Sequence, residues 1–180
     1  MIYNSVAEIF EMIDKTRNEL KQRVSGLTDE EKNFRAGDNE SWSVAEIVEH
    51  LVTVEGGVVK LTAKLLTKAE ADGIKSDGRL DPPVSFVEQA KSIENRKLQA
   101  PERIHPQGAQ SIDDSLTKLD ENRRLLNELR PRIEMTDSSN TAFPHPFFGN
   151  INLYQWLVMI GMHEARHLKQ IEGILQANKD

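Results

Sequence analysis

The stretch that decides the fold is Met162-His163-Glu164-Ala165-Arg166-His167-Leu168. Its two histidines are four residues apart, so on a helix they share one face. That face carries the apolar stripe of the surrounding segment, where leucine is the ordinary occupant. An unsatisfied buried polar group costs about 1–3 kcal/mol, so two in succession need a compensating partner. A divalent metal is the simplest such partner. The stripe reads Leu153, Trp156, Ile160, His163, His167, Gln170, Ile174.

Length and composition are those of an ordinary globular chain. The 180 residues suffice for one full hydrophobic core, and we expect a single domain over residues 1–180. A net charge of −6 without a basic cluster argues against nucleic-acid binding. No cysteine is present, which excludes disulfides and thiolate ligands. We find neither a signal-peptide pattern nor an apolar run near the ~20 residues of a membrane span, and so expect a cytoplasmic protein without membrane contact.

Helical periodicity predicts four long helices and an all-α fold. The predicted helices cover residues 2–25, 43–69, 111–129 and 151–177. The second opens on the capping-box pattern Ser43-Val44-Ala45-Glu46. The third is expected to end before Pro131, which cannot continue the hydrogen-bond ladder. No segment shows the sustained alternation of a strand. A short helix near 84–97 is expected inside the long connection 70–110.

Two imidazoles alone hold a metal poorly, because catalytic zinc sites commonly use three protein ligands. The chain offers three further histidines, His50, His105 and His145. The last two each precede a proline in a predicted loop, whereas His50 lies in a predicted helix at the edge of its apolar stripe. We therefore predict one metal site formed by His50, His163 and His167. In this interpretation His145 is a loop residue that could line the rim of the site.

The levels of these histidines along their helices predict the topology. At ~1.5 Å per residue, His50 lies about 10 Å from the start of helix 43–69, and His167 lies about 15 Å from the end of helix 151–177. The two levels coincide when these helices run antiparallel, whereas a parallel arrangement separates the ligands by about 8–14 Å. The expected fold is an up-down-down-up four-helix bundle, with residues 70–110 as the long crossover between the second and third helices.

The histidine pair also spells His-Glu-x-x-His, the pattern of zincin proteases, in which Glu164 would be the general base. Zincins take a third ligand further downstream. No histidine follows His167 in this chain, and the remaining segment is short. Glu164 also lies off the core stripe beside Arg166, so we expect a surface acid. We therefore do not interpret the pattern as a protease motif.

Several polar residues lie near the level of the predicted site. Gln170 continues the stripe one turn beyond His167, where it either supports a ligand imidazole or reaches solvent. Glu46 and Glu55 flank His50 on its helix, and a role for either in supporting the site is the weaker alternative. The sequence assigns no catalytic residue and no cofactor-binding residue; His50, His163 and His167 are predicted only as metal ligands.

The aromatic and basic residues near the site receive structural interpretations. Trp42 and Trp156 are expected to pack the bundle rather than contact a substrate. Arg123, Arg124 and Arg166 are expected to be solvated charges, and binding of an anionic cosubstrate by one of them is the alternative.

Three segments resemble the DinB-like (YfiT-like) superfamily. Trp42-Ser43-Val44-Ala45-Glu46-Ile47-Val48-Glu49-His50-Leu51 is similar to its second-helix motif. His163-Glu164-Ala165-Arg166-His167-Leu168-Lys169-Gln170-Ile171 is similar to its fourth-helix motif, and His145-Pro146-Phe147-Phe148-Gly149 resembles the preceding loop. The resemblance extends over most of the chain. It implies an up-down-down-up bundle with one divalent metal on His50, His163 and His167.

The resemblance also implies a reaction class. Characterised members include thiol-dependent transferases that use bacillithiol or mycothiol, and a thiol-dependent isomerase. The expected function is S-transfer of a low-molecular-weight thiol to a small-molecule substrate, with zinc or nickel as the expected ion. The alternatives are a hydrolase that uses metal-bound hydroxide and a non-catalytic, metal-stabilised stress-response or binding module. A homodimer is one assembly that the resemblance allows.

Overall fold

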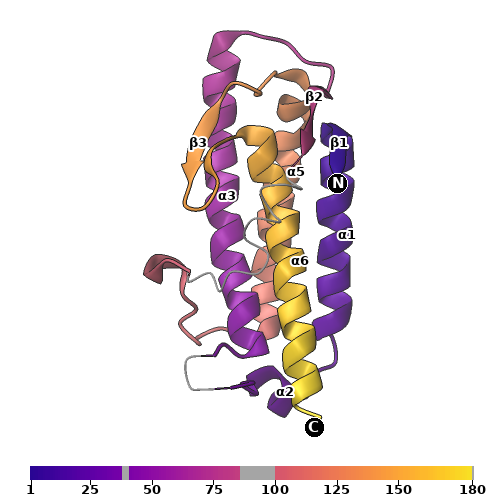
Figure 1. Cartoon of the computed structure of the whole chain (residues 1–180), viewed down its shortest axis with the longest axis vertical. Helices are drawn as coiled ribbons and strands as arrows, with labels where there is room; N and C mark the ends of the chain where they lie inside the picture. The colour runs from indigo at the N-terminus through magenta and orange to yellow at the C-terminus, as the bar shows by residue number, and fades with distance from the viewer. Residues whose placement is uncertain (38–40, 86–99, 180) are drawn as a thin grey trace.

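Four long helices build the protein in the computed structural model, which describes residues 1–37, 41–85 and 100–179. Figure 1 shows two of them running in one direction and the other two running in the opposite direction. The described helices are α1 (Val6–Val24), the short α2 (Asp29–Asn33), α3 (Val44–Asp72), the 3-10 turn η1 (Glu102–Ile104), α5 (Ile112–Met135) and α6 (Leu153–Ala177).

The order of directions confirms the predicted up-down-down-up four-helix bundle. Helices α1 and α6 descend in the view of Figure 1, whereas α3 and α5 ascend side by side. The connection between α3 and α5 is therefore the predicted crossover. It begins at Gly73, whose φ of 71° ends α3 in the left-handed conformation that glycine adopts without strain. The short helix expected near 84–97 falls almost entirely on residues outside the described ones, and residues 84–85 belong to a strand.

Two short antiparallel strand pairs were missed by the sequence analysis. β1 (Ile2–Ser5) pairs with β2 (Arg79–Ser85), and β3 (Ala142–His145) pairs with β4 (Gly149–Asn152). Strands of four to seven residues are too short for a clear alternating pattern. The first helix consequently begins at Val6 rather than at residue 2. Ser5 is its N-cap, and the Ser5 side chain accepts a hydrogen bond from the backbone N–H of Glu8.

The prediction that the third long helix ends before Pro131 is wrong, because α5 continues through Pro131 to Met135. Proline removes one backbone hydrogen bond from the helix interior. Tertiary contacts hold the turn beyond it. Ile133 is fully buried, and the Nη2 atom of Arg132 lies 2.6 Å from Oε2 of Glu70 on α3.

The apolar core consists of two clusters, one toward each end of the bundle. Each long helix contributes to both clusters, and between them it carries a stretch of about two to three turns with polar residues on its inner side. We call this level the polar layer. The buried apolar residues that bracket it are Ile13 and Leu20 on α1, Val48 and Val58 on α3, Leu119 and Leu126 on α5, and Ile160 and Ile171 on α6.

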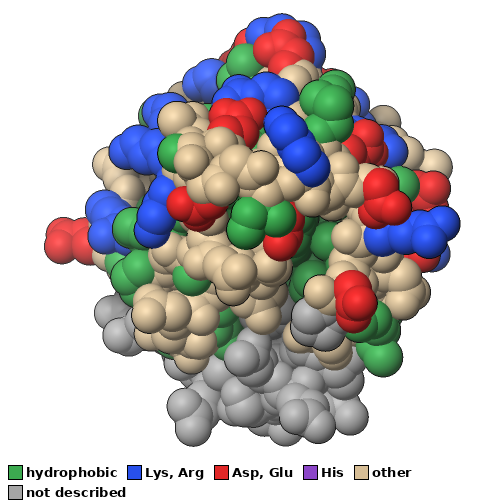
Figure 2. All heavy atoms as spheres, turned by 90° about the horizontal axis from the view of Figure 1, so that it is seen from above, with side chains coloured by type: hydrophobic (Ala, Val, Ile, Leu, Met, Phe, Trp, Pro, Cys, Tyr) green, Lys and Arg blue, Asp and Glu red, His purple; other side chains and the backbone are tan. Residues whose placement is uncertain are grey.

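The surface carries charges of both signs. Figure 2 shows one end of the molecule, where basic and acidic side chains are interspersed. Among the described residues, no helix is both long enough and apolar enough to cross a lipid bilayer.

Candidate metal centre

The polar layer brings His50, His163 and His167 together, and we call them the histidine triad. The Nε2 atom of His163 lies 3.3 Å from Nε2 of His50 and 3.1 Å from Nε2 of His167. One ligand atom from each ring lies within 4.8 Å of the other two. Nitrogen atoms at ~2.0–2.1 Å from a tetrahedral zinc ion are about 3.3 Å apart. The two Nε2 spacings around His163 therefore fit a divalent ion of this size.

Two of the three rings are oriented by hydrogen bonds from their other nitrogen. Nδ1 of His50 lies 2.7 Å from the backbone carbonyl oxygen of Ile104, and Nδ1 of His167 lies 3.0 Å from Oε1 of Gln170. An oxygen of this kind only accepts, so each Nδ1 carries the proton and donates it. The Nε2 lone pairs of both rings therefore face the centre of the triad. Of the two alternatives for Gln170, the structure shows the one in which it supports an imidazole.

Electrostatics keep the triad neutral. Burial lowers the pKa of His50, and burial together with His167 lowers the pKa of His163 well below its usual range. For His167, burial and then the neighbouring His50 lower the pKa to about 3. Neutral imidazole is the form that binds metals. His163 can donate at most one hydrogen from Nε2, so at least one inward lone pair stays unmatched, whereas a cation would match all three.

A buried carboxylate next to the triad was missed by the sequence analysis. Glu49 is only 4% exposed and accepts hydrogen bonds from the backbone N–H groups of Gly108, at 2.9 Å, and Gln107, at 3.3 Å. These bonds fix the segment after η1 against α3, and Ile104, the last residue of η1, supplies the carbonyl that orients His50. No Lys or Arg lies near Glu49 in the sequence to indicate that this side chain is buried. Its role becomes visible only in the tertiary structure.

Aromatic packing completes the surroundings of His50. The ring centroid of Trp42 lies 4.8 Å from that of His50 and 5.7 Å from that of His105. Trp42 thus has the predicted packing role, although it packs on a member of the triad. His105 is an exposed loop residue whose Nε2 lies 2.8 Å from the carbonyl oxygen of Ala100, so it stays outside the triad.

A second buried polar cluster lies in the same layer, and each long helix contributes one residue to it. We call Arg17, Glu55, Arg123 and Glu164 the ion network. Nε of Arg17 lies 2.6 Å from Oε1 of Glu164, and its Nη2 donates to Glu55. Nη2 of Arg123 lies 3.2 Å from Oε1 of Glu55, and its Nη1 lies 2.6 Å from Oδ1 of Asp14. None of the four network residues is more than 7% exposed.

The ion network corrects two predictions. Glu164 is not a surface acid, since it is 2% exposed, and Arg123 is not a solvated charge. Burial raises the pKa of Glu164, and the adjacent Arg17 guanidinium acts against that change. Burial also opposes the charge of Arg17, but Glu55 and Glu164 outweigh it, and the pKa of Arg17 is raised. Arg124 and Arg166 are exposed as predicted.

The two glutamates considered on the helix of His50 have different roles. Glu46 completes the capping box at Ser43 and pairs with Arg35. Glu55 belongs to the ion network and pairs with both of its arginines. Neither glutamate has a hydrogen bond to the histidine triad.

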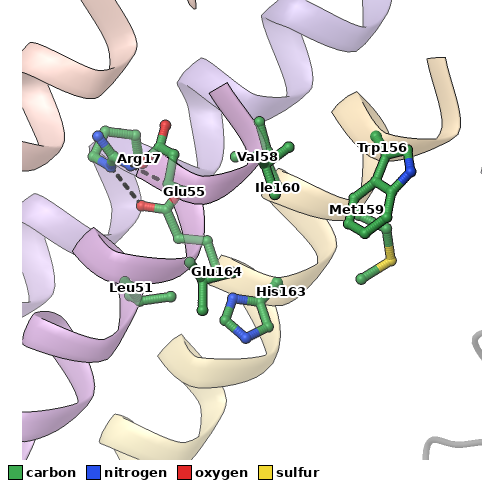
Figure 3. A pocket seen from close by; sticks show the side chains of 10 residues that line it. Arg17, Leu51, Glu55, Val58, Trp156, Met159, Ile160, His163 and Glu164 are labelled. Carbon is green, nitrogen blue, oxygen red and sulfur yellow. Dashed lines mark hydrogen bonds and ion pairs between the residues drawn. The ribbon is translucent and has the colours of Figure 1, made fainter. Parts of the chain in front are cut away.

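A pocket of about 40 Å³ adjoins the triad between α3 and α6 (Figure 3). Its charged end consists of Arg17, Glu55 and Glu164, and His163 is the member of the triad that lines it. Trp156 therefore contributes to a pocket wall in addition to packing the bundle. The apolar residues of the wall are Leu51, Val54, Val58, Trp156, Met159 and Ile160.

His145 packs against the pocket residue Trp156, close to the rim position that the sequence allowed for it. Its ring stacks on Phe148 with centroids 4.7 Å apart, and it packs against Trp156 at 5.1 Å. Its charge when protonated would also disfavour protonation of His163. Burial lowers the pKa of His145 itself. The ring is thus part of the surroundings of the pocket, but it does not join the histidine triad.

The topology and the triad together point to one family of metal-binding bundles. The family model of the DinB superfamily matches residues 12–171, so the chain belongs to this superfamily. A curated relative, the uncharacterized protein YuaE of Bacillus subtilis (strain 168), is 31% identical over 167 residues, which cover 89% of this chain and 90% of YuaE.

Two solved structures share the fold. TT2238, a four-helix bundle protein, matches with a TM-score of 0.61 at 20% identity, over 93% of this chain and 98% of its own. YfiT from Bacillus subtilis, described as a probable metal-dependent hydrolase with an unusual four-helix bundle topology, matches with a TM-score of 0.61 at 18% identity. That match covers 94% of this chain and 85% of YfiT. At these identities the likeness establishes the fold.

Proposed function

We propose that this protein is a metal-dependent enzyme in which His50, His163 and His167 hold one divalent ion, and that it transfers a low-molecular-weight thiol to a small electrophilic substrate. The observation that carries the proposal is the convergence of three Nε2 atoms in a buried layer, with neighbouring donor atoms 3.1 and 3.3 Å apart. Zinc and nickel both suit imidazole ligands.

The residues around the triad supply orientation and a dry environment. Ile104 and Gln170 hold two of the imidazoles in the tautomer that presents Nε2 to the ion. The apolar wall of the adjoining pocket limits water near His163. A divalent ion on three neutral imidazoles keeps its full charge and lowers the pKa of a thiol or water in its open position.

The absence of cysteine supports an external thiol as the nucleophile. In the proposed reaction the sulfur of the deprotonated thiol attacks the electrophilic carbon, a carbon–sulfur bond forms, and the leaving group departs with its electron pair. The thiol proton passes to solvent. No side chain among the described residues can supply the sulfur nucleophile in its place.

A hydrolase is the second candidate, because the structural neighbour YfiT is described as a probable metal-dependent hydrolase. Both candidates use the same ion and differ in the nucleophile, which is a thiol in one and water in the other. The dependence of turnover on added thiol separates them.

The test has two parts. Elemental analysis of untagged protein should find one divalent ion per chain in the wild type and a clear loss in His163→Ala. Turnover of a chromogenic aryl halide should then require both the ion and a low-molecular-weight thiol, tested with simple alkanethiols as well as with bacillithiol and mycothiol. Substoichiometric metal in the wild type would contradict the metal site. Ester or amide hydrolysis that proceeds without thiol would instead favour the hydrolase.

A further inference from the structure

The pocket beside His163 is lined by apolar residues on one side and by charged residues at one end. Six apolar residues, three from α3 and three from α6, form its wall. The other end contains three charged groups of the ion network, which Figure 3 shows gathered beside the wall, with Arg17 joined by dashed lines to its partners. A charged end could recognise a charged ligand, so the state of these groups decides what the pocket accepts.

The charged groups at that end are already paired with one another. Arg17 donates to Glu164, to Glu55 and to the backbone carbonyl of Leu119. Both carboxylates also face Arg123, whose Nη2 lies 3.2 Å from Glu55 and 3.8 Å from Glu164. Within the network two guanidinium groups face two carboxylates, and Arg123 has a further partner in the half-exposed Asp14. A charged ligand group would therefore lose its hydration without gaining an unpaired partner.

The size of the pocket limits the ligand further. A volume of about 40 Å³ compares with roughly 10–15 Å³ for one water position on the same kind of measure. The space thus suits a chain of about two to four carbon atoms.

We propose that this pocket is a specificity site that selects the ligand at the metal by a short, uncharged apolar group. The group lies between α3 and α6 beside His163, against Val54, Val58 and Met159. This inference rests on the proposed function, because it assumes a metal-bound ligand next to the pocket. It adds the class of thiol that binds at the metal, which is one whose sulfur carries a short, uncharged aliphatic group.

Binding of simple alkanethiols to the cobalt-substituted protein tests the proposal without turnover. Sulfur-to-cobalt absorption reports the bound thiolate, and the thiol proton passes to the buffer. Affinity should rise about fourfold per methylene from ethanethiol to butanethiol, as expected for burial of apolar carbon, and then level off at hexanethiol. Mercaptopropionate, which has a charged end, should bind at least tenfold more weakly than propanethiol.

Matched variants locate the effect. Val54 and Val52 are both half-buried valines on α3, but only Val54 lines the pocket. Val54→Phe should remove the dependence on chain length, whereas Val52→Phe should leave it unchanged. Met159→Ala should move the plateau to longer thiols.

The outcomes separate this inference from the proposed function. Affinity that does not vary from ethanethiol to hexanethiol, or equal binding of mercaptopropionate and propanethiol, would overturn the specificity site while leaving metal and thiol binding intact. The same holds if Val52→Phe and Val54→Phe act alike. If cobalt binds but no thiol produces the sulfur-to-cobalt band, thiol transfer fails as the function, and the specificity site falls with it.

Discussion

The histidine triad and the ion network share one layer of the bundle but differ in what they need. The ion network pairs every charge it buries, with two guanidinium groups against two carboxylates. The triad instead directs neutral nitrogen atoms at one another across 3.1 and 3.3 Å. The ion network is complete within the chain, whereas under the proposed function a divalent cation completes the triad.

This difference assigns the two clusters separate tasks. A buried ion pair contributes little net stability, yet removal of one partner leaves an uncompensated charge that costs several kcal/mol. Because the ion network has one residue on each of the four long helices, it fixes the packing of these helices against one another. Under the proposed function the triad gains its compensation only when the ion binds, so its free energy should appear as affinity for that ion. A substitution in the triad should therefore change the affinity for the ion, whereas a substitution in the ion network should change the free energy of unfolding.

The largest effect is expected for His163→Ala. This change removes the nitrogen that lies within hydrogen-bonding distance of both other members of the triad. Metal affinity should fall by more than about 100-fold, beyond the usual effect of losing a supporting residue. Isothermal titration with zinc measures the affinity. His145→Ala is the control. His145 lies outside the triad, so this variant should bind zinc with the affinity of the wild type.

The next effect should appear in stability. Arg17→Met leaves Glu55 and Glu164 buried without their main partner, and the free energy of unfolding should fall by about 3–5 kcal/mol. Urea unfolding of the metal-free protein measures it. Arg124→Met removes an exposed arginine that pairs with Glu121 and Glu128, and should change stability by less than about 1 kcal/mol. Equal losses in the two variants would contradict the role of the ion network.

The same comparison explains what the sequence could predict. Histidines are few, so two of them on one apolar stripe and a third at a matching level are informative. Because helical rise is fixed, the levels of His50 and His167 also predicted the antiparallel pairing of their helices. The topology and the members of the triad were therefore within reach of local rules.

The ion network was not within reach of those rules. Charged residues number 52 in this chain, the sum of 23 basic and 29 acidic ones, so a single Glu or Arg carries little information. Glu164 lies one position from the stripe, and only the packing of α1 against α6 decides that it faces Arg17. A weak signal did exist in Arg17 itself, which lies at helical spacing between the buried Ile13 and Leu20.

A smaller effect should come from the residue that supports His167. Gln170→Ala removes the acceptor of the Nδ1 proton and should lower metal affinity by about 10–100-fold. The stability of the metal-free protein should change little, because Gln170 is exposed. Gln176→Ala is the matched control, an exposed glutamine on the same helix without contact to the triad. An unchanged zinc affinity in Gln170→Ala would show that Gln170 does not orient the imidazole.

The smallest effect should be a pH dependence that separates the clusters in the metal-free protein. The folded pKa of His167 is about 3, below the ~6.5 of an unfolded histidine, so the unfolded chain binds the proton more readily. Stability from this group is complete above pH ~6.5 and is lost as the pH falls toward 3, by up to about 1.4 kcal/mol per pH unit. Between pH 6.5 and 5, His167→Leu should therefore lose stability less steeply than the wild type in urea unfolding, whereas Arg17→Met should keep the wild-type slope at a lower stability. If the free energy of unfolding changes equally with pH in the wild type and in His167→Leu, burial does not lower the pKa of His167. Neutral imidazoles would then not explain why the triad favours a metal cation over protons.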